Sequence, residues 1–407
     1  MAVSIPKRNY KNPVACASAF GRFFYAVDSI VYYSQVVISP NDAGRCYQSN
    51  DPTSSKLPDL LDTDGGVLEL EDTRNIKAMK SFRSGVIVFA GNGVWYIANP
   101  NGGFTATAYS VEKISDRGIE SPNSIIEGQG VIYYFSNNGI MALTANEENN
   151  LQVADIAEER IRSYFLTNYA GKRAEGVYDD GQKQCIWWIP EVQGSGLVYD
   201  TRLASFYPQK LASATTYLKR PFTIENAVYY PSATQLLGAT TISYNFSNTT
   251  NRQFKDFGVN QSAYLISGYE TLGKFANKKS ISQAKVYFRK TEGVITGAVD
   301  NAYTFDYPSG CLFQARWDFD NTDAFGKFSG LLPTSGKGKE MQLYKPMQRG
   351  FIPNAYPYTF NTGEGLISKK FNIRGNGDSV QFVFRAEDEK DLQLLGYSVN
   401  FTMRGKM

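Results

Sequence analysis

The sequence predicts an all-β fold of the β-propeller type, and three observations support it. Residues 85–97 hold two short apolar runs around an Asn-Gly pair, which is the strongest short-range signal for a β-hairpin. Similar runs begin at Gly130 and, more loosely, at Gly176, so the pattern recurs within the roughly 40–50-residue spacing of propeller blades. Aromatic residues make up 14% of the chain and suit pleated, half-buried strands.

The N-terminal part contains a further hairpin and a loop. Residues 20–36 form two apolar runs separated by Asp28 and Ser29, which predicts two paired strands. Residues 39–58 are polar and punctuated by proline, as in a loop, and a strand is expected at 67–70.

One helix is predicted, near 153–166. Apolar residues recur there at helical spacing, while charged residues occupy the rest of the wheel. Such a stripe is typical of a helix that packs on a core, so no partner-binding role is expected for it.

The rest of the chain is predicted as strands and irregular segments. Strand, turn and strand are expected over 196–207, and the pattern weakens over 221–279. Further strands are expected at 280–289, 293–299, 371–374, 379–385 and 396–404. We therefore expect three parts: propeller blades in 1–220, an accessory β-rich insertion in 221–345, and C-terminal strands in 346–407 that complete the propeller.

Composition excludes several kinds of site. The chain has no histidine, which excludes a His-based catalytic triad and a His-ligated metal. The four cysteines, Cys16, Cys46, Cys185 and Cys311, are far apart in the sequence, as expected for free thiols in a reducing compartment. A net charge of +3 lacks the marked basic excess of a dedicated nucleic-acid binder.

The segments that could hold a ligand fail on spacing. Residues 62–66 and 318–323 hint at calcium loops but lack the required ligands or the closing Glu, so both are expected to be turns whose Asp side chains bond backbone. Residues 330–338 fail as a phosphate loop because the glycines are too far apart. No spacing singles out a carboxylate pair for glycoside cleavage. Trp187 and Trp188 resemble a stacking platform, but in an alternating strand at least one belongs to the core. No cofactor, metal or catalytic residue is predicted.

One segment invites a charge-based role. Lys337, Lys339, Lys345 and Arg349 lie among Gly and Pro in an irregular stretch. A solvated loop is the simpler interpretation. The alternative is a loop that lines a channel and meets phosphates without sequence preference.

An ordered set of segments resembles the nozzle, or tail-hub, proteins of short-tailed, podovirus-type bacteriophages. The similar segments cover most of the chain: 46–53, 59–66, 86–97, 110–118, 198–208, 371–375, 379–384, 394–399 and 404–406. They are clearest in 20–208 and 370–406, whereas 221–345 offers the least to match.

This resemblance implies a structural virion protein that is not an enzyme. Six copies would form a ring that continues the DNA channel below the portal and adaptor, retains the genome and lets it pass on ejection. Implied partners are the adaptor, a needle or fibre protein and viral DNA in the lumen. The implied location is the virion tail, assembled in the host cytoplasm, which agrees with the absence of a signal-peptide core at the start of the chain and of an apolar run long enough to span a bilayer. The alternative is a glycan-degrading or glycan-binding propeller.

Overall fold

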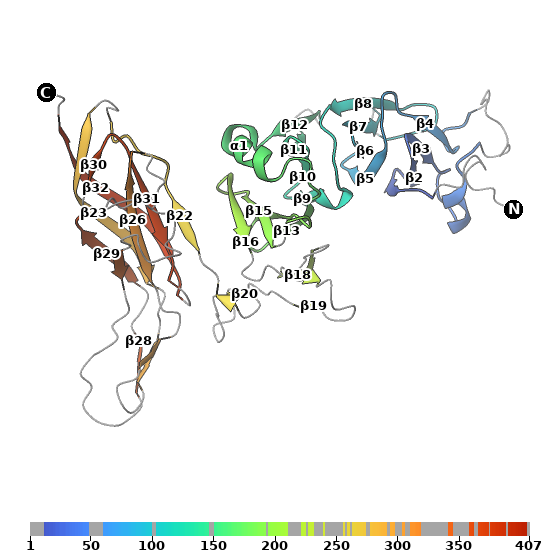
Figure 1. Cartoon of the computed structure of the whole chain (residues 1–407). Helices are drawn as coiled ribbons and strands as arrows, with labels where there is room; N and C mark the ends of the chain where they lie inside the picture. Colours follow the sequence, from blue (N-terminus) through green and yellow to red (C-terminus); the bar gives the residue numbers. More distant parts are fainter. Residues whose placement is uncertain are drawn as a thin grey trace. The chain divides into compact units, whose positions relative to one another are not determined.

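The computed structural model describes residues 12–48, 60–99, 103–145, 150–192, 194–210 and much of 221–404. Its gaps in that last range are 225–226, 232–238, 241–254, 257–258, 261–262, 274–276, 291–293, 298–302, 306–309, 319–340, 345–357, 362–364, 374 and 388–389. The chain divides into two compact units, residues 1–244 and 245–407. Both are built from antiparallel strands (Figure 1), which confirms the predicted all-β class.

The first unit is a series of four four-stranded antiparallel sheets, each with its strands in chain order. Sheet 1 comprises β1 (Ala15–Ala19), β2 (Arg22–Val27), β3 (Ile30–Tyr33) and β4 (Gly66–Glu69). Sheet 2 comprises β5 (Ile76–Phe82), β6 (Gly85–Ala90), β7 (Gly93–Ala98) and β8 (Ser110–Ser115). Sheet 3 comprises β9 (Ile126–Gly128), β10 (Val131–Ser136), β11 (Gly139–Ala145) and β12 (Leu151–Asp155). Sheet 4 comprises β13 (Glu175–Asp179), β14 (Gln184–Trp188), β15 (Ser195–Asp200) and β16 (Ser205–Lys210). This is the blade architecture of a β-propeller.

Shorter elements complete the unit. A three-stranded sheet follows sheet 4, with β17 (Phe222–Ile224), β18 (Ala227–Pro231) and β19 (Ala239–Thr240). Two short 3-10 helices are η1 (Pro40–Gly44) and η2 (Pro122–Ser124). The first strands of neighbouring sheets lie together: β1 contacts β5, β9 contacts β13, and β13 contacts β17.

The hairpin prediction at the Asn-Gly pair holds with a shift of one residue. Strand β6 ends at Ala90, the two-residue loop is Gly91-Asn92, and Gly93 already pairs with Ala90 as the first residue of β7. A Cβ on Gly93 would lie 2.8 Å from the carbonyl oxygen of Ser115. Glycine is needed here because β8 approaches so closely.

The third repeat belongs to a different position in its sheet. The runs at 85 and 130 lead into the second strands of sheets 2 and 3, whereas Gly176 lies in β13, the first strand of sheet 4. The structural equivalent is the hairpin of β14 and β15. The mismatch arises because β13, which contains Val177 and Tyr178, also forms a hairpin with the apolar strand β14. The sequence signal of this hairpin resembles that of the hairpin of β14 and β15.

The cores lie between sheets, and the inner sheets bury both faces. All six residues of β6 are buried. Val86 and Val88 pack in a core with sheet 1 that includes Phe24. Ile87 and Phe89, which alternate with them, pack in a core with sheet 3. Side chains alternate between the faces of a strand, so one continuous apolar run serves two interfaces.

Sheet 3 likewise contributes alternate residues of one strand to two different cores. Ile132 and Tyr134 of β10 face the core shared with sheet 2. Tyr133 and Phe135 face a core with sheet 4 that contains Trp187. Each fully buried aromatic or aliphatic side chain contributes about 1.5–3 kcal/mol to folding, so the stability of each sheet depends on its neighbours.

Polar links join sheets 2 and 3 at the margins of their shared core. Lys77 Nζ lies 2.9 Å from Glu120 Oε2, and Glu120 also accepts a 2.6 Å hydrogen bond from Asn137 in the β10–β11 turn. Lys80 of β5 pairs with Glu127 of β9 at 2.7 Å. Arg117, after β8, pairs with Asp155 at the end of β12. These partly exposed pairs each add at most about 1 kcal/mol, so they supplement an arrangement of the two sheets that the shared apolar core determines.

The predicted helix begins later than expected. Residues 151–155 form β12, which pairs with β11, because Val153 packs beside the core between sheets 2 and 3. Helix α1 runs Glu158–Asn168 and buries Phe165 against sheets 3 and 4. The carboxylate of Asp155, the last residue of β12, accepts the amide of Ala157 at 2.9 Å, which forms a turn between the strand and the helix.

The second unit contains two sheets that enclose one core. One has β22 (Tyr264–Ile266), β31 (Val380–Arg385), β26 (Cys311–Trp317) and β27 (Met341–Tyr344), in that order. The other has β29 (Gly365–Phe371), β23 (Lys278–Lys290), β30 (Asn376–Gly377) and β32 (Gln393–Arg404). Smaller pairings involve β20 (Lys255–Asp256), β21 (Val259–Asn260), β24 (Val294–Gly297), β25 (Tyr303–Phe305) and β28 (Tyr358–Asn361).

These pairings differ from the predicted division of the C-terminal half. Residues 346–407 were expected to complete the propeller, apart from an insertion in 221–345. In the described residues, β29, β31 and β32 instead pair with β22, β23 and β26 of residues 264–317. The reason is a shared core: Phe382 and Phe384 of β31 pack with Val286 and Phe313. Alternation alone identified the strands but not their partners.

We expect that replacing Phe89 with alanine will destabilise the first unit by about 3–5 kcal/mol, because the ring is fully buried against Tyr134 at 5.4 Å between centroids. Chemical unfolding followed by fluorescence and circular dichroism measures the change. Val111→Ala on β8, where the side chain is 38% exposed, is the control and should shift stability by less than about 1 kcal/mol. Equal effects of the two substitutions would contradict the inter-sheet core.

Candidate functional site

The basic residues singled out from the sequence, Lys337, Lys339, Lys345 and Arg349, lie outside the described residues. The structure therefore does not test their channel-lining role. Other polar features of the described residues give the chain its candidate sites.

The first feature is a buried arginine in sheet 1. Arg22 begins β2 and is only 2% exposed. Its guanidinium donates to the carbonyl oxygen of Ser34 at 2.7 Å and to the carbonyls of Asp62 and Asp64. The rings of Tyr33 and Phe104 each lie 5.8 Å from the guanidinium carbon. Burial lowers the pKa of Arg22, and nearby Tyr33, Asp64 and Asp62 oppose that shift.

This arrangement accounts for the sequence of residues 62–66, which resembles a calcium-binding loop. The loop carbonyls face an internal cation, the guanidinium of Arg22. The Asp64 carboxylate accepts the amide of Leu61 at 2.9 Å, so the prediction of a turn whose Asp bonds its own backbone is confirmed. Of the other candidate loop, 318–323, only Asp318 is described, and its carboxylate accepts the amides of Asp378 and Ser379. Residues 319–323 lie outside the described residues.

The second feature is the turn after β15. Asp200 Oδ1 accepts the amides of Arg202 and Leu203 at 2.9 and 3.1 Å. Its Oδ2 accepts hydrogen bonds from Arg202 Nη2 at 3.1 Å and Gln184 Nε2 at 3.3 Å. Desolvation of the carboxyl opposes ionisation, but the bonds from Arg202, Leu203 and Gln184 outweigh it and lower the pKa of Asp200 to about 2. The carboxylate thus locks the β15–β16 hairpin.

Both features were hard to predict from the sequence. A single charged residue within an aromatic run, as at Arg22, signals a buried polar partner but not which one. Two of its three hydrogen-bond partners, Asp62 and Asp64, are 40 and 42 residues away, in a segment that only the fold brings near. The Asp200 turn was recognised as strand, turn and strand without the role of its carboxylate.

The tryptophan pair and most of the cysteines lie inside the protein. Trp187 and Trp188 are both buried, and Trp187 Nε1 donates to the carbonyl of Ser124 at 2.9 Å. They therefore offer no exposed stacking platform. All four cysteines are free thiols; Cys16 is exposed and the others are buried. Burial raises the pKa of Cys46 to about 12, which keeps that thiol protonated.

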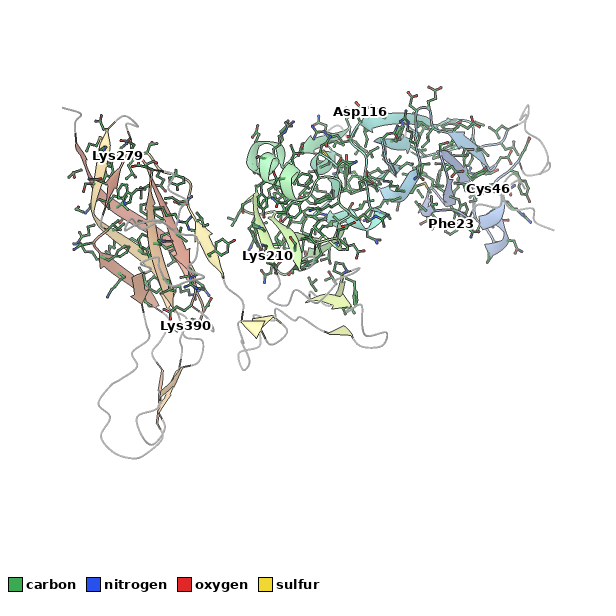
Figure 2. The ribbon with its side chains drawn as sticks, in the orientation of Figure 1. Phe23, Cys46, Asp116, Lys210, Lys279 and Lys390 are labelled. Atoms are coloured by element: carbon green, nitrogen blue, oxygen red, sulfur yellow. The ribbon has the colours of Figure 1, made fainter. Side chains whose placement is uncertain are left out.

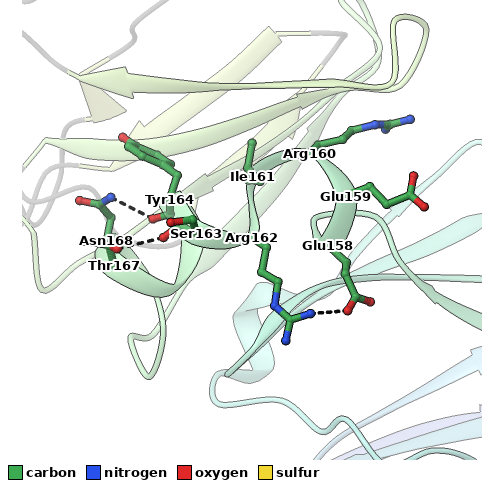
Figure 3. A pocket seen from close by; sticks show the side chains of 9 residues that line it. All are labelled: Glu158, Glu159, Arg160, Ile161, Arg162, Ser163, Tyr164, Thr167 and Asn168. Carbon is green, nitrogen blue, oxygen red and sulfur yellow. Dashed lines mark hydrogen bonds and ion pairs between the residues drawn. The ribbon is translucent and has the colours of Figure 1, made fainter. Parts of the chain in front are cut away.

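A shallow hollow lies along helix α1 (Figure 3). It has a volume of about 630 Å³ and is lined by α1 residues that include Glu158, Arg162 and Tyr164. Glu158 and Arg162 form an ion pair along the helix. Residues of one helix provide the whole lining, so the hollow follows that helix and brings no second element to a ligand.

Across the described part of the chain there is no group of three or more Cys, Asp or Glu arranged for a metal ion. In the same residues, no helix is long and apolar enough to cross a bilayer.

Comparison with known proteins gives only distant similarity. The chain matches no family model and no curated protein. Among solved structures it is similar to PorZ, a bacterial surface component of the type-IX secretion system of Porphyromonas gingivalis, at 6% identity and TM-score 0.34, over 55% of this chain and 26% of PorZ. A streptogramin B lyase matches at 14% identity and TM-score 0.30, over 56% and 64%. Virginiamycin B lyase from Staphylococcus aureus matches at 11% identity and TM-score 0.32, over 55% and 64%. The chain spans less than two thirds of each of these proteins.

The comparisons correct one expectation. Two of these similar structures are lyases, and this finding overturns the expectation that the chain is not an enzyme. The likeness is too low to transfer a reaction, a substrate or a catalytic residue to this chain.

We expect Arg22→Met to destabilise the first unit by about 3 kcal/mol, because three buried carbonyls would lose a charged donor. Arg22→Lys should cost less, since the charge stays but the fork that reaches several carbonyls is lost. Arg160→Met on the exposed side of α1 is the control. Thermal and denaturant unfolding measure these differences. A wild-type midpoint for Arg22→Met would contradict a stabilising role for the hydrogen bonds from Arg22 to the three carbonyls.

The Asp200 turn gives a pH-dependent stability. The folded pKa of about 2 lies below an unfolded value of about 3.9, so the carboxylate stabilises the fold above about pH 4. This contribution, about 2 kcal/mol, is lost as the pH falls from 4 to 2. In Asp200→Asn the drop in unfolding free energy over that interval should shrink by the same amount. An identical pH profile in both proteins would contradict the assignment.

Proposed function

We propose that the chain is a subunit of the nozzle in the tail of a short-tailed bacteriophage. Six copies would form a ring that continues the DNA channel below the portal and adaptor, retains the genome and lets it pass on ejection. The partners would be the adaptor, a needle or fibre protein, and viral DNA in the lumen. The site of action would be the virion tail.

One observation carries this proposal. Several of the segments that resemble nozzle proteins coincide with regular strands in both units. Residues 86–97 and 110–118 contribute β6, β7 and β8 of one sheet, and 198–208 contribute β15 and β16 of another. The C-terminal segments contribute to β31 and β32. The resemblance therefore falls on ordered strands of the fold.

The architecture suits a mechanical part. Sheets that bury both faces resist bending, because any change in the angle between them opens a close-packed core. Identical rigid subunits close into a ring through head-to-tail contacts around an axis. A conduit must also pass DNA without gripping it strongly, because each neutralised phosphate adds affinity. The near balance of 42 basic and 39 acidic residues supports that requirement.

Electron microscopy of virions tests the proposal. An antibody fragment or a fused tag on this chain should label a ring between the adaptor and the tip of the tail. Particles assembled without the chain should lose their packaged DNA or lack the distal tail. Label that is absent from the tail would contradict the proposal.

A further inference from the structure

The second unit carries one strongly basic sheet. Strands β29, β23 and β32 contain no Asp or Glu. Their basic residues are Lys278, Lys279, Lys285, Arg289, Lys290, Lys369, Lys370 and Arg404. The charged residues of these three strands are therefore all of one sign.

Alternation along β23 separates its two faces. Ala284, Val286 and Phe288 are buried in the core of the unit. Lys285 and Arg289 alternate with them and lie on the outer face, with Lys285 half-buried and Arg289 exposed. The inward Lys279 is fully buried and donates to the carbonyl of Asp378 at 2.9 Å, so this lysine serves the fold. Figure 2 shows Lys279 on the sheet.

The strand register places like charges opposite each other on the outer face. Lys285 pairs directly with Lys370 of β29. Directly opposed side chains on paired strands lie about 5 Å apart at Cβ, and like charges in that arrangement destabilise a sheet. At the far end of β23, Lys278 is in register with Arg404 of β32. The Lys285–Lys370 pair thus carries an electrostatic cost that the fold does not require, and local costs of this kind mark functional surfaces.

The surroundings of the lysine pair suit a phosphate backbone. Tyr287 lies next to the pair, and Lys285 Nζ is 4.9 Å from the centre of its ring. The residues in register with Lys285 and Tyr287 on the other strands include Ser368, Ser398 and Gly396, which are small and allow close approach. Hydroxyl and ammonium donors together with an aromatic ring are the groups that proteins use to hold nucleic-acid strands without reading their sequence.

We propose that the outer face of β29, β23 and β32 binds the phosphate backbone of nucleic acid, with Lys285, Lys370 and Arg289 as phosphate contacts and Tyr287 beside them. An anion that bridges Lys285 and Lys370 removes the repulsion between them. Nucleic acid fits better than an anionic membrane, because the residues in register with Lys285 and Tyr287 are small or polar. The exposed Leu366 lies opposite Arg289, at the end of β23 away from Lys278. A role for this face in the virion tail rests on the proposed function. Binding of nucleic acid by the isolated chain does not depend on that function.

The test is equilibrium binding of the full chain to a fluorescent, mixed-sequence DNA duplex over a range of salt concentrations. Lys285→Gln with Lys370→Gln removes two contacts, so the slope of log affinity against log salt should fall by about 2 and affinity at 0.1 M salt by tenfold or more. Lys369→Gln with Arg160→Gln removes the same charge elsewhere; Lys369 neighbours Lys370 but pairs with the inward Val286. This control should keep most of the affinity. Vesicles of anionic lipid serve as the competing surface and should bind more weakly than the duplex.

Thermal unfolding of the same proteins supplies an independent readout. At low salt the Lys285→Gln, Lys370→Gln protein should melt at the wild-type temperature or above it, because the opposed charges are gone. Loss of DNA binding therefore cannot be attributed to unfolding. Wild-type affinity and salt slope in this variant would overturn the binding face, and so would preference for vesicles over DNA. Neither result depends on where the chain lies in a virion, which the labelling of tails decides separately.

Discussion

Burial of both faces of the inner sheets is the constraint on which the first unit depends. A strand such as β6 places Val86 and Val88 in one core and Ile87 and Phe89 in the next. Neither sheet 2 nor sheet 3 can keep its apolar residues from water without a neighbour on each side. The series of sheets is therefore one structure with shared cores, and the polar links at Lys77, Lys80 and Arg117 act at the margins of an arrangement that packing has already fixed.

The same constraint explains what could be predicted from the sequence. Strands buried on both faces read as continuous apolar runs, and this made the hairpins at 85 and 130 visible. The position of Gly176 within its sheet was not predictable in the same way, because sheet 4 has two consecutive hairpins with similar sequence signals. The start of α1 was misplaced since Val153 fits a helical stripe as well as it fits β12. The partners of the C-terminal strands and of Arg22 are determined by contacts between residues far apart in the sequence. The local pattern of apolar and polar residues does not predict such contacts.

The two units divide their chemistry in different ways. In the first unit, charged groups such as Arg22 and Asp200 stabilise the fold. Each is buried and forms hydrogen bonds with backbone groups of a loop that lies close in space. In the second unit, the basic residues of β23 and β29 remain on an outer face with an unfavourable register. Charged groups thus stabilise the fold in the first unit and form an exposed basic surface in the second.

Native-state hydrogen exchange tests the central claim about shared cores most directly. If sheets 1 to 4 depend on one another, the slowest amides of β2, β6, β10 and β14 will exchange with the same opening free energy and the same denaturant dependence. Weakening any one core will then accelerate all four strands together. Distinct opening energies for each sheet, with a core substitution felt only by the two sheets it joins, would show independent hairpins and contradict the serial architecture.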